Sequence, residues 1–388
     1  MSARRKGPRH GLEGLLDGKR VLVCAGAGGV GKTTVSAAVA AGAAARGKRV
    51  TVVTIDPARR LATALGIPEL GNEEHRVEPE LLAEAGIEAE SEGGELWAMM
   101  LDSKRTFDEL VERRAPDART RDAVLSNRIY QELSAAVAGS QEYMAMEKLF
   151  ELHEERRYDL IVLDTPPSRN ALDFLDAPER LARFIDSRSL RFFLAPGRRG
   201  LKIISRGTGV LFSVLKRVTG IDLLRDLSEF FQSFGDMAEG FNERARRVRG
   251  LLTSRTTTFL LVTTPQDESI EEVDFFRRRL ADDGMPFGGV VVNRVRGPAG
   301  DGGQVPQDPG REAVEGELAE HVDEALARKA ARNLEDYEIL TRHDAASVKR
   351  LRDALGSRSE LIVVADLDED VHDLDGLARM HDYLFRDS

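Results

Sequence analysis

Short apolar runs recur along this chain and alternate with longer amphipathic stretches. The runs that predict core strands are Arg20 to Ala25, Arg49 to Ile55, Leu96 to Leu101, Leu160 to Leu163, Phe259 to Thr263, Gly289 to Val292 and Leu361 to Val364. Helical stretches separate them, which is typical of α/β folds. The pattern therefore predicts a mostly parallel central sheet flanked by helices.

Two long stretches without strand character interrupt this alternation. They lie at about residues 103–155 and 200–250, and both predict helices inserted between successive strands. The first 19 residues are polar and basic, which predicts a flexible tail. We therefore expect one domain over residues 20–388 with two helical insertions.

The second insertion carries a broad apolar helix face. Its members follow alternating spacings of four and three: Leu223, Leu227, Phe230, Phe234, Met237 and Phe241. Such a stripe is more often core than binding groove, although its Phe and Met content favours an adaptable surface. Both interpretations stay open at this point.

A glycine-rich loop follows the first predicted strand and precedes an Ala-rich helix, predicted from Thr33 to Arg46. The loop, Gly26 to Thr34, fits the phosphate-binding pattern G-x-x-x-x-G-K-[ST]. Its backbone N–H groups and the helix N-terminus can surround a triphosphate. The residues expected to bind the nucleotide are Gly28, Gly29, Val30, Gly31, Lys32, Thr33 and Thr34. Lys32 would reach the β- and γ-phosphates, and Thr33 would ligate Mg²⁺. The fold class expected is thus an α/β P-loop NTPase.

Two further strands end in a carboxylate. Asp56 follows the second strand, and its side chain would orient attacking water or simply form an Asx-Pro turn. Asp164 ends the apolar run Leu160 to Leu163, as expected for the second magnesium-organising residue. Lys32, Asp56 and Asp164 are therefore the candidate catalytic residues, with Thr33 and Asp164 at the metal.

Taken together, these motifs resemble the family of the arsenite-pump ATPase (ArsA) and the guided-entry targeting ATPase for tail-anchored membrane proteins. The family's three motifs have counterparts here in Gly26 to Thr34, in Asp56-Pro57-Ala58-Arg59-Arg60-Leu61 and in the segment Asp164 to Leu175. The resemblance implies Mg²⁺ and ATP as ligands, slow ATP hydrolysis, and Asn293 as the residue that reads adenine.

The chain departs from the family pattern at the second loop position. Family members carry a lysine there that contacts the nucleotide of the opposing subunit, but this chain has Ala27. The resemblance then implies either a homodimer completed by another cation or a heterodimer with a related ATPase. Arg59, Arg60 and Arg169 are the candidate substitutes, although a solvent-facing role is the commoner one for any single arginine.

Composition narrows the functional classes. The net charge is -10, which argues against a general nucleic-acid binder. Cys24 is the only cysteine, so neither an internal disulfide nor a Cys-x-x-Cys zinc site can form. The absence of a secretory apolar stretch and of any run of transmembrane length predicts a cytoplasmic protein, peripheral at the inner face of the membrane if it docks there.

The function expected is that of a nucleotide-driven switch coupled to a membrane transporter or to delivery of a hydrophobic client. One alternative is a spatial or regulatory switch of the MinD/ParA kind, although the large second insertion argues against so compact a class. The other alternative is a low-turnover subunit of a heterodimer.

Overall fold

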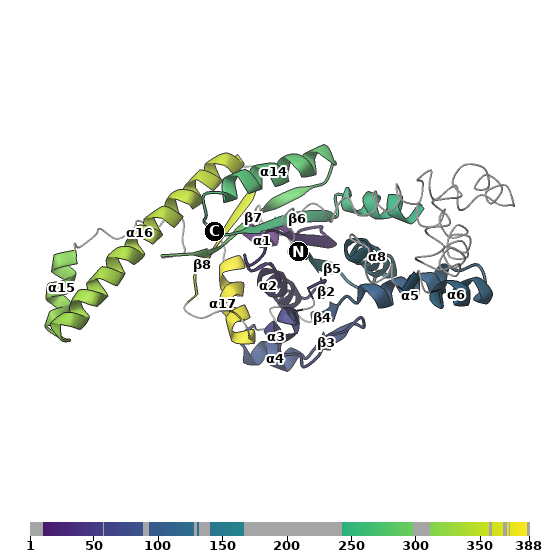
Figure 1. Ribbon diagram of the computed structural model, residues 1–388, viewed down its shortest axis with the longest axis horizontal. Helices are drawn as coiled ribbons and strands as arrows, with labels where there is room; N and C mark the ends of the chain where they lie inside the picture. Colours follow the sequence, from purple (N-terminus) through teal and green to yellow (C-terminus); the bar gives the residue numbers. More distant parts are fainter. Residues whose placement is uncertain are drawn as a thin grey trace, which may run out of the picture. The chain divides into compact units, whose positions relative to one another are not determined.

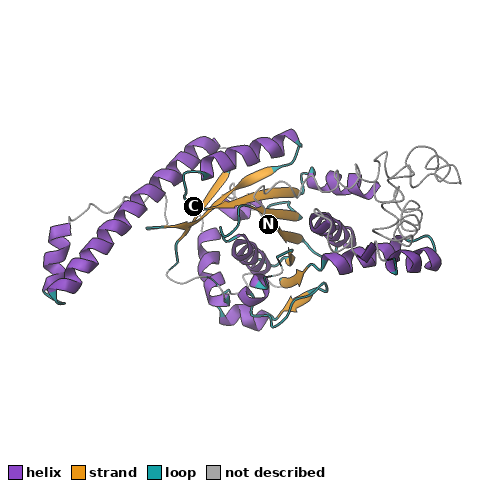
Figure 2. Cartoon of the chain, in the orientation of Figure 1, coloured by secondary structure: helices purple, strands orange, loops and turns teal. Residues whose placement is uncertain are grey.

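The computed structural model describes residues 11–56, 58–87, 93–127, 130–131, 140–166, 243–297, 311–356, 359–367, 371 and 373–385. The chain divides into two compact units. The first comprises residues 1–100, 156–172 and 253–388, and the second comprises 101–155 and 173–252. Figure 1 labels the elements, and Figure 2 shows the strands of the first unit against its helices.

The first unit is built on a sheet of eight strands in the order β3-β4-β2-β5-β1-β6-β7-β8. Their bounds are β1 Val21–Ala25, β2 Arg49–Thr54, β3 His75–Val77, β4 Glu95–Met100, β5 Leu160–Asp164, β6 Thr257–Thr263, β7 Phe287–Val295 and β8 Glu360–Ala365. All neighbours pair in parallel except β3 with β4. The mostly parallel α/β sheet predicted from the apolar runs is therefore confirmed.

Helices cover this sheet because its strands are apolar on both faces. Every residue of β1, β5 and β6 is buried, as expected for central parallel strands. The helices of this unit are α1 Gly11–Leu15, α2 Lys32–Ala45, α3 Arg60–Ala64, α4 Pro79–Glu84, α14 Ser269–Asp282, α15 Arg311–Ala319, α16 Glu324–Leu355 and α17 Leu374–Leu384. The Ala-rich helix α2 is buried along most of its length and lies in the core cluster.

The expectation of a flexible tail over residues 1–19 is wrong for residues 11–19. Helix α1 buries Leu12, and Leu15 and Leu16 join it in the core cluster. The Lys19 ammonium donates to the Arg255 carbonyl oxygen at 2.7 Å, which ties the end of this segment to the loop before β6. Three leucines thus anchor a stretch whose overall composition is basic and polar.

The second unit is helical where it is described. It contains α5 Ser103–Arg114, α6 Ala118–Leu125, α8 Ser140–Glu155 and a helical segment over residues 243–252. The guanidinium of Arg244 pairs with the almost fully buried Glu147 at 2.5 Å, which links residues 243–252 to α8. The expected apolar face from Leu223 to Phe241 lies outside the described residues.

Candidate functional site

The glycine-rich loop connects β1 to α2 at the carboxyl edge of the sheet. Gly31 has a φ of 91°, in the left-handed region that favours glycine. A side chain there would also collide with the Asn293 amide, which approaches the loop from β7. Asn293 Nδ2 donates to the Val30 carbonyl oxygen at 2.9 Å. The loop is therefore shaped by its own backbone and held from a distant strand.

Lys32 is folded back over the loop. Its ammonium donates to the Ala27 carbonyl oxygen at 2.8 Å, and the side chain is buried. Burial lowers the pKa of Lys32, whereas the charges of Asp164, Asp56 and Glu272 oppose that shift. Three carboxylates thus surround one cation at the start of α2.

Glu272 on α14 holds the other side of Ala27. The Ala27 backbone hydrogen-bonds the Glu272 carboxylate, and the Thr263 hydroxyl donates to its Oε2 at 3.4 Å. Burial raises the pKa of Glu272, although both hydrogen bonds and the charge of Lys32 lower it. The second position of the loop is thereby fixed through both of its backbone groups.

Asp164 lies beneath the loop and joins three segments. Its Oδ2 accepts from the Thr33 hydroxyl at 2.7 Å and from the Thr54 hydroxyl at 2.8 Å. Thr33 lies in the first turn of α2, Thr54 ends β2 and Asp164 ends β5. Because these strands are parallel neighbours, their carboxyl ends reach the same edge.

The second oxygen of Asp164 is buried, and no described group hydrogen-bonds it. Burial raises the pKa of Asp164 to about 6, against the opposing effects of Thr33, Thr54 and Lys32. A buried oxygen without a partner costs free energy, which a cation or a bound water would recover. This carboxylate and the Thr33 hydroxyl suit Mg²⁺, which takes oxygen ligands and draws several of them from water and phosphate.

Asp56 follows β2 at the entrance to the site. Its Oδ1 accepts from the Ala58 amide at 2.9 Å, an Asx turn, and its Oδ2 lies 3.5 Å from the Arg60 guanidinium. The turn considered from the sequence is present, and the carboxylate nevertheless lines the pocket. Arg59 has a φ of 56° and is the N-cap residue of α3, which begins at Arg60.

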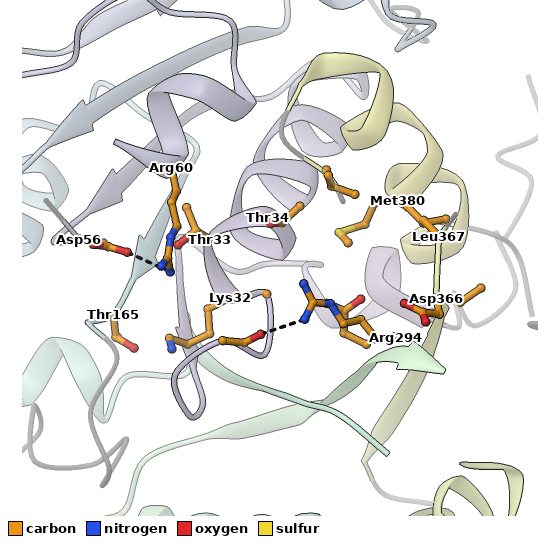
Figure 3. Close-up of a pocket in the computed structure, with 15 residues that line it drawn as sticks. Lys32, Thr33, Thr34, Asp56, Arg60, Thr165, Arg294, Asp366, Leu367 and Met380 are labelled. Atoms are coloured by element: carbon orange, nitrogen blue, oxygen red, sulfur yellow. Dashed lines mark hydrogen bonds and ion pairs between the residues drawn. The ribbon is translucent and has the colours of Figure 1, made fainter. Parts of the chain in front are cut away.

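A pocket of about 440 Å³ opens above the loop. Its lining residues come from the loop, from α2, α3 and α17, and from the ends of β2, β5, β7 and β8 with the segments that follow them: Gly29, Gly31, Lys32, Thr33, Thr34, Asp56, Arg60, Thr165, Asn293, Arg294, Ala365, Asp366, Leu367, Val371 and Met380. Figure 3 shows Lys32, Asp56, Arg60 and Thr165 on one side and Arg294, Asp366, Leu367 and Met380 on the other. The pocket thus has charged residues at the end near the loop, and both charged and apolar residues at the end beside β8.

The structure brings most of the sequence-predicted site residues together in this pocket, but Arg169 lies outside the described residues. Sequence reasoning missed Thr54, Glu272 and Arg294. Thr54 could have been found, because it ends the strand that leads to Asp56. Arg294 has a φ of 59° and lies 3.5 Å from the Gly29 carbonyl oxygen, an approach that no sequence signal gives.

The comparisons with known proteins agree with this geometry. The family model of the anion-transporting ATPases, ArsA_ATPase, matches residues 19–329, and the chain therefore belongs to this family. Among the described residues, none of the helices is both long enough and apolar enough to cross a membrane.

The relatives cover the chain to different extents. The ATPase get3 of Aspergillus terreus is 25% identical over 79% of this chain and 81% of its own length. The ATPase ASNA1 homolog of Babesia bovis is 24% identical over 74% of this chain and 70% of its own length. A protein of Halobacterium salinarum named "Putative arsenical pump-driving ATPase" is 33% identical over 47% of this chain, and the match spans only 27% of that protein.

The raised pKa of Asp164 leads to a prediction about stability. At neutral pH its charge is present in both the folded and the unfolded chain, and moving its pKa from 3.8 to about 6 costs the folded state roughly 3 kcal/mol. Asp164→Asn removes that charge, and the Thr33 and Thr54 hydroxyls can rotate to suit the amide. We therefore expect nucleotide-free Asp164→Asn to unfold at higher denaturant concentration than the parent at pH 7.

The sign of the pH dependence follows from the same shift. The folded state takes up a proton first, so the advantage of Asp164→Asn should shrink as the pH falls from 7 to 4. Urea midpoints measured across that range test it, with Asp353→Asn on the exposed side of α16 as the control. An advantage that is absent at pH 7, or unchanged at pH 4, would contradict the assignment.

Proposed function

We propose that this protein binds Mg-ATP in the pocket above the loop and hydrolyses ATP slowly. The observation that carries the proposal is the Asp164 carboxylate, which is bonded to Thr33 through one oxygen and left without a described partner at the other. The membership of the chain in an ATPase family supports it. In this proposal Lys32 turns from Ala27 to the β- and γ-phosphates, while the loop amides hold the remaining phosphate oxygens.

The metal in this proposal is Mg²⁺. Thr33 and Asp164 would hold it, and when bound it would supply charge that offsets the developing negative charge on the phosphates. The chain's own part is to keep the Asp164 carboxylate ionised, which the two threonine hydroxyls favour by donating to it. Thr165 follows directly and donates to the Cys24 carbonyl oxygen at 2.8 Å, which fixes this end of the site to β1.

Asp56 is proposed to orient the attacking water. Its carboxylate lines the pocket and is held by the Ala58 amide and Arg60, so that its direction is set before substrate binds. A base that is already positioned contributes chiefly in the transition state.

Asn293 is proposed to read the base. Its Nδ2 is engaged by the Val30 carbonyl oxygen, which leaves Oδ1 as the acceptor for an exocyclic amine. Adenine carries such an amine where guanine carries a carbonyl, so this arrangement favours ATP over GTP.

Asp56→Asn should preserve nucleotide affinity and reduce kcat by at least about a hundredfold, because it removes a group needed mainly in the transition state. Lys32→Ala should abolish binding or turnover. Binding of a fluorescent ATP analogue and steady-state phosphate release measure the two effects separately. The matched control is Asp282→Asn, an exposed carboxylate at the end of α14. If Asp56→Asn hydrolyses ATP at the parental rate, Asp56 does not have this role.

The charge missing at Ala27 is proposed to come from arginines around the pocket. Arg60 is 62% exposed beside Asp56, and Arg294 lies against the loop at Gly29. Both line the pocket, and in this proposal one of them contacts a phosphate once a dimer closes. A heterodimer whose partner supplies the lysine is the other form of this proposal.

Arg60→Ala or Arg294→Ala should lower kcat by about three powers of ten if that arginine replaces the missing cation. Arg60→Lys and Arg294→Lys are the matched variants that retain charge and should recover part of the rate. The ATPase rate is measured against protein concentration, alone and with a candidate related ATPase. Fast hydrolysis by a monomer, independent of concentration and of both arginines, would refute both forms.

ATP hydrolysis is proposed to drive a conformational change that a membrane transporter or a hydrophobic client senses. The support is the family, in which named relatives include an arsenical pump-driving ATPase and get3-type ATPases, and the apolar segment from Leu223 to Phe241. In this proposal, movement of the chain after Asp164 on hydrolysis is what changes the exposure of that segment.

Hydrogen exchange of the segment Leu223 to Phe241 should therefore differ between the nucleotide-free, ADP-bound and ATP-bound states. We expect the amides of this segment to exchange slowly in one state and at least about tenfold faster in another, because segments of low local stability open more readily than the core. Peptides from β6 and β7 serve as internal controls, because their residues are buried in the sheet. Equal protection in all three states would show that the segment is constant core.

A further inference from the structure

Helix α16 carries one apolar stripe whose two halves lie in different surroundings. In the C-terminal half the stripe packs onto the rest of the first unit, and its buried members are Asp344, Ser347, Val348, Leu351 and Leu355. At about 100° per residue, Leu326, Ala330, Tyr337 and Leu340 fall on the same face within about 80°. The helix has 32 residues, and in Figure 1 its N-terminal half extends beyond the sheet. Among the described residues of this unit, the core-facing stripe therefore continues where its side chains are not buried.

The neighbouring helix α15 packs on a different face of α16. The two helices are in contact, and Ala327 and Ala331 are the buried residues in the N-terminal half of α16. Two ion pairs fix this packing, Arg328 with Glu315 at 3.1 Å and Arg311 with Glu335 at 3.8 Å. Arg328 and Glu335 lie roughly opposite the stripe on the helical wheel. Consequently α15 leaves the stripe open.

The open part of the stripe is strongly exposed for its residue types. The exposed fractions are 51% for Leu326, 46% for Tyr337 and 45% for Leu340, with Leu334 beside them at 41%. We call Leu326, Ala330, Asn333, Tyr337 and Leu340 the α16 stripe. Contiguous exposed apolar residues on one helix face indicate a surface that another element covers.

The α16 stripe is symmetric about its own centre. Leu326 and Leu340 are equally far from Asn333, and the pair Ala330 and Tyr337 is centred within one residue of it. Lys329 and Asp336 lie beside the stripe on one side, and the midpoint between them falls within one residue of Asn333. They are about 10 Å apart along the helix, too far to pair within one chain. An antiparallel second copy would place each beside its opposite charge.

We propose that the α16 stripe is an interface with a second copy of this chain, formed by two antiparallel α16 helices about a two-fold axis at Asn333. Such an interface is isologous, with the same patch on both subunits. Leu326 of each copy packs against Leu340 of the other, and Ala330 against Tyr337. The two Asn333 amides meet on the axis and hydrogen-bond, a polar contact that fixes helix register in coiled coils.

Two features favour a second copy over other occupants. A membrane surface favours basic residues around an apolar face, but the C-terminal part of this stripe is flanked by the acidic Asp336 and Glu338. Binding to an unrelated partner would not explain why the apolar pairs and the charged pair are all centred near Asn333. That centre also lies beyond residue 329, where the family match ends.

Cysteine cross-linking of the full chain tests the axis. Asn333→Cys should cross-link to itself through a short bis-maleimide, whereas the native Cys24 is fully buried and should not react. The matched control is Glu335→Cys, which lies at nearly the same height but roughly 160° around the helix. Cross-linked dimer from Asn333→Cys but not from Glu335→Cys supports the proposal. Absence of the Asn333→Cys dimer, or equal yields from both variants, overturns it.

Charge exchange tests the pairing. Lys329→Asp should weaken the dimer by about tenfold, because it creates two like-charge contacts across the axis. Adding Asp336→Lys to Lys329→Asp should restore the parental affinity, since both pairs are then reversed together. Light scattering over a concentration series, with and without ATP, measures the mass. A monomer at every concentration, or a dimer that ignores both variants, refutes the interface.

Discussion

The hydrogen bonds from Thr33 and Thr54 to a single carboxylate oxygen of Asp164 organise the site. They join residues far apart in the chain, and they exist because β2, β5 and β1 are adjacent parallel strands that end at one edge. The carboxylate is buried, so its charge is tolerated only through these donors and the nearby Lys32. The site therefore retains a charge that does not stabilise the fold, as expected where function rather than stability sets the residue.

The loop illustrates how a family position can change its side chain without losing its backbone geometry. The carbonyl of Ala27 accepts from Lys32, and its backbone hydrogen-bonds Glu272. Both contacts involve the main chain, so they do not depend on the residue type. The alanine side chain carries no charge, and Arg60 and Arg294 are cations that line the same pocket. Ala27 thus keeps the backbone hydrogen bonds of the loop but supplies no positive charge.

The sequence predicted the central strands well because a parallel strand buried on both faces is a continuous apolar run. β1, β2 and β5 begin and end within one residue of the predicted bounds. Strand β3 was missed, because three residues at an antiparallel edge, two of them exposed, leave no such run. Helix α1 was missed because its leucines lie within a basic segment whose average composition conceals them.

The site residues, like the strands and helices, divide into those that a local sequence pattern predicts and those that it does not. Lys32 and Thr33 were predicted from the spacing of the glycine-rich motif, and Asp164 was predicted because it ends an apolar run. Glu272 reaches the loop from α14, and Arg294 reaches it through a left-handed backbone conformation. Such contacts depend on tertiary packing, which no local pattern encodes.

Helix α16 shows the limit of periodicity more sharply. Its stripe runs from Leu326 to Leu355 with Asn333, Asp344 and Ser347 as polar members. The members from about Thr341 onward are buried, whereas those before it are not. An apolar repeat in a helix predicts that one face of the helix is buried. The width of the sheet decides how much of that face the sheet can bury. The rest of the stripe faces solvent unless a second protein surface with a matching pattern of apolar and charged residues packs against it. Because the stripe is symmetric about Asn333, the surface that meets this condition most directly is the same helix reversed.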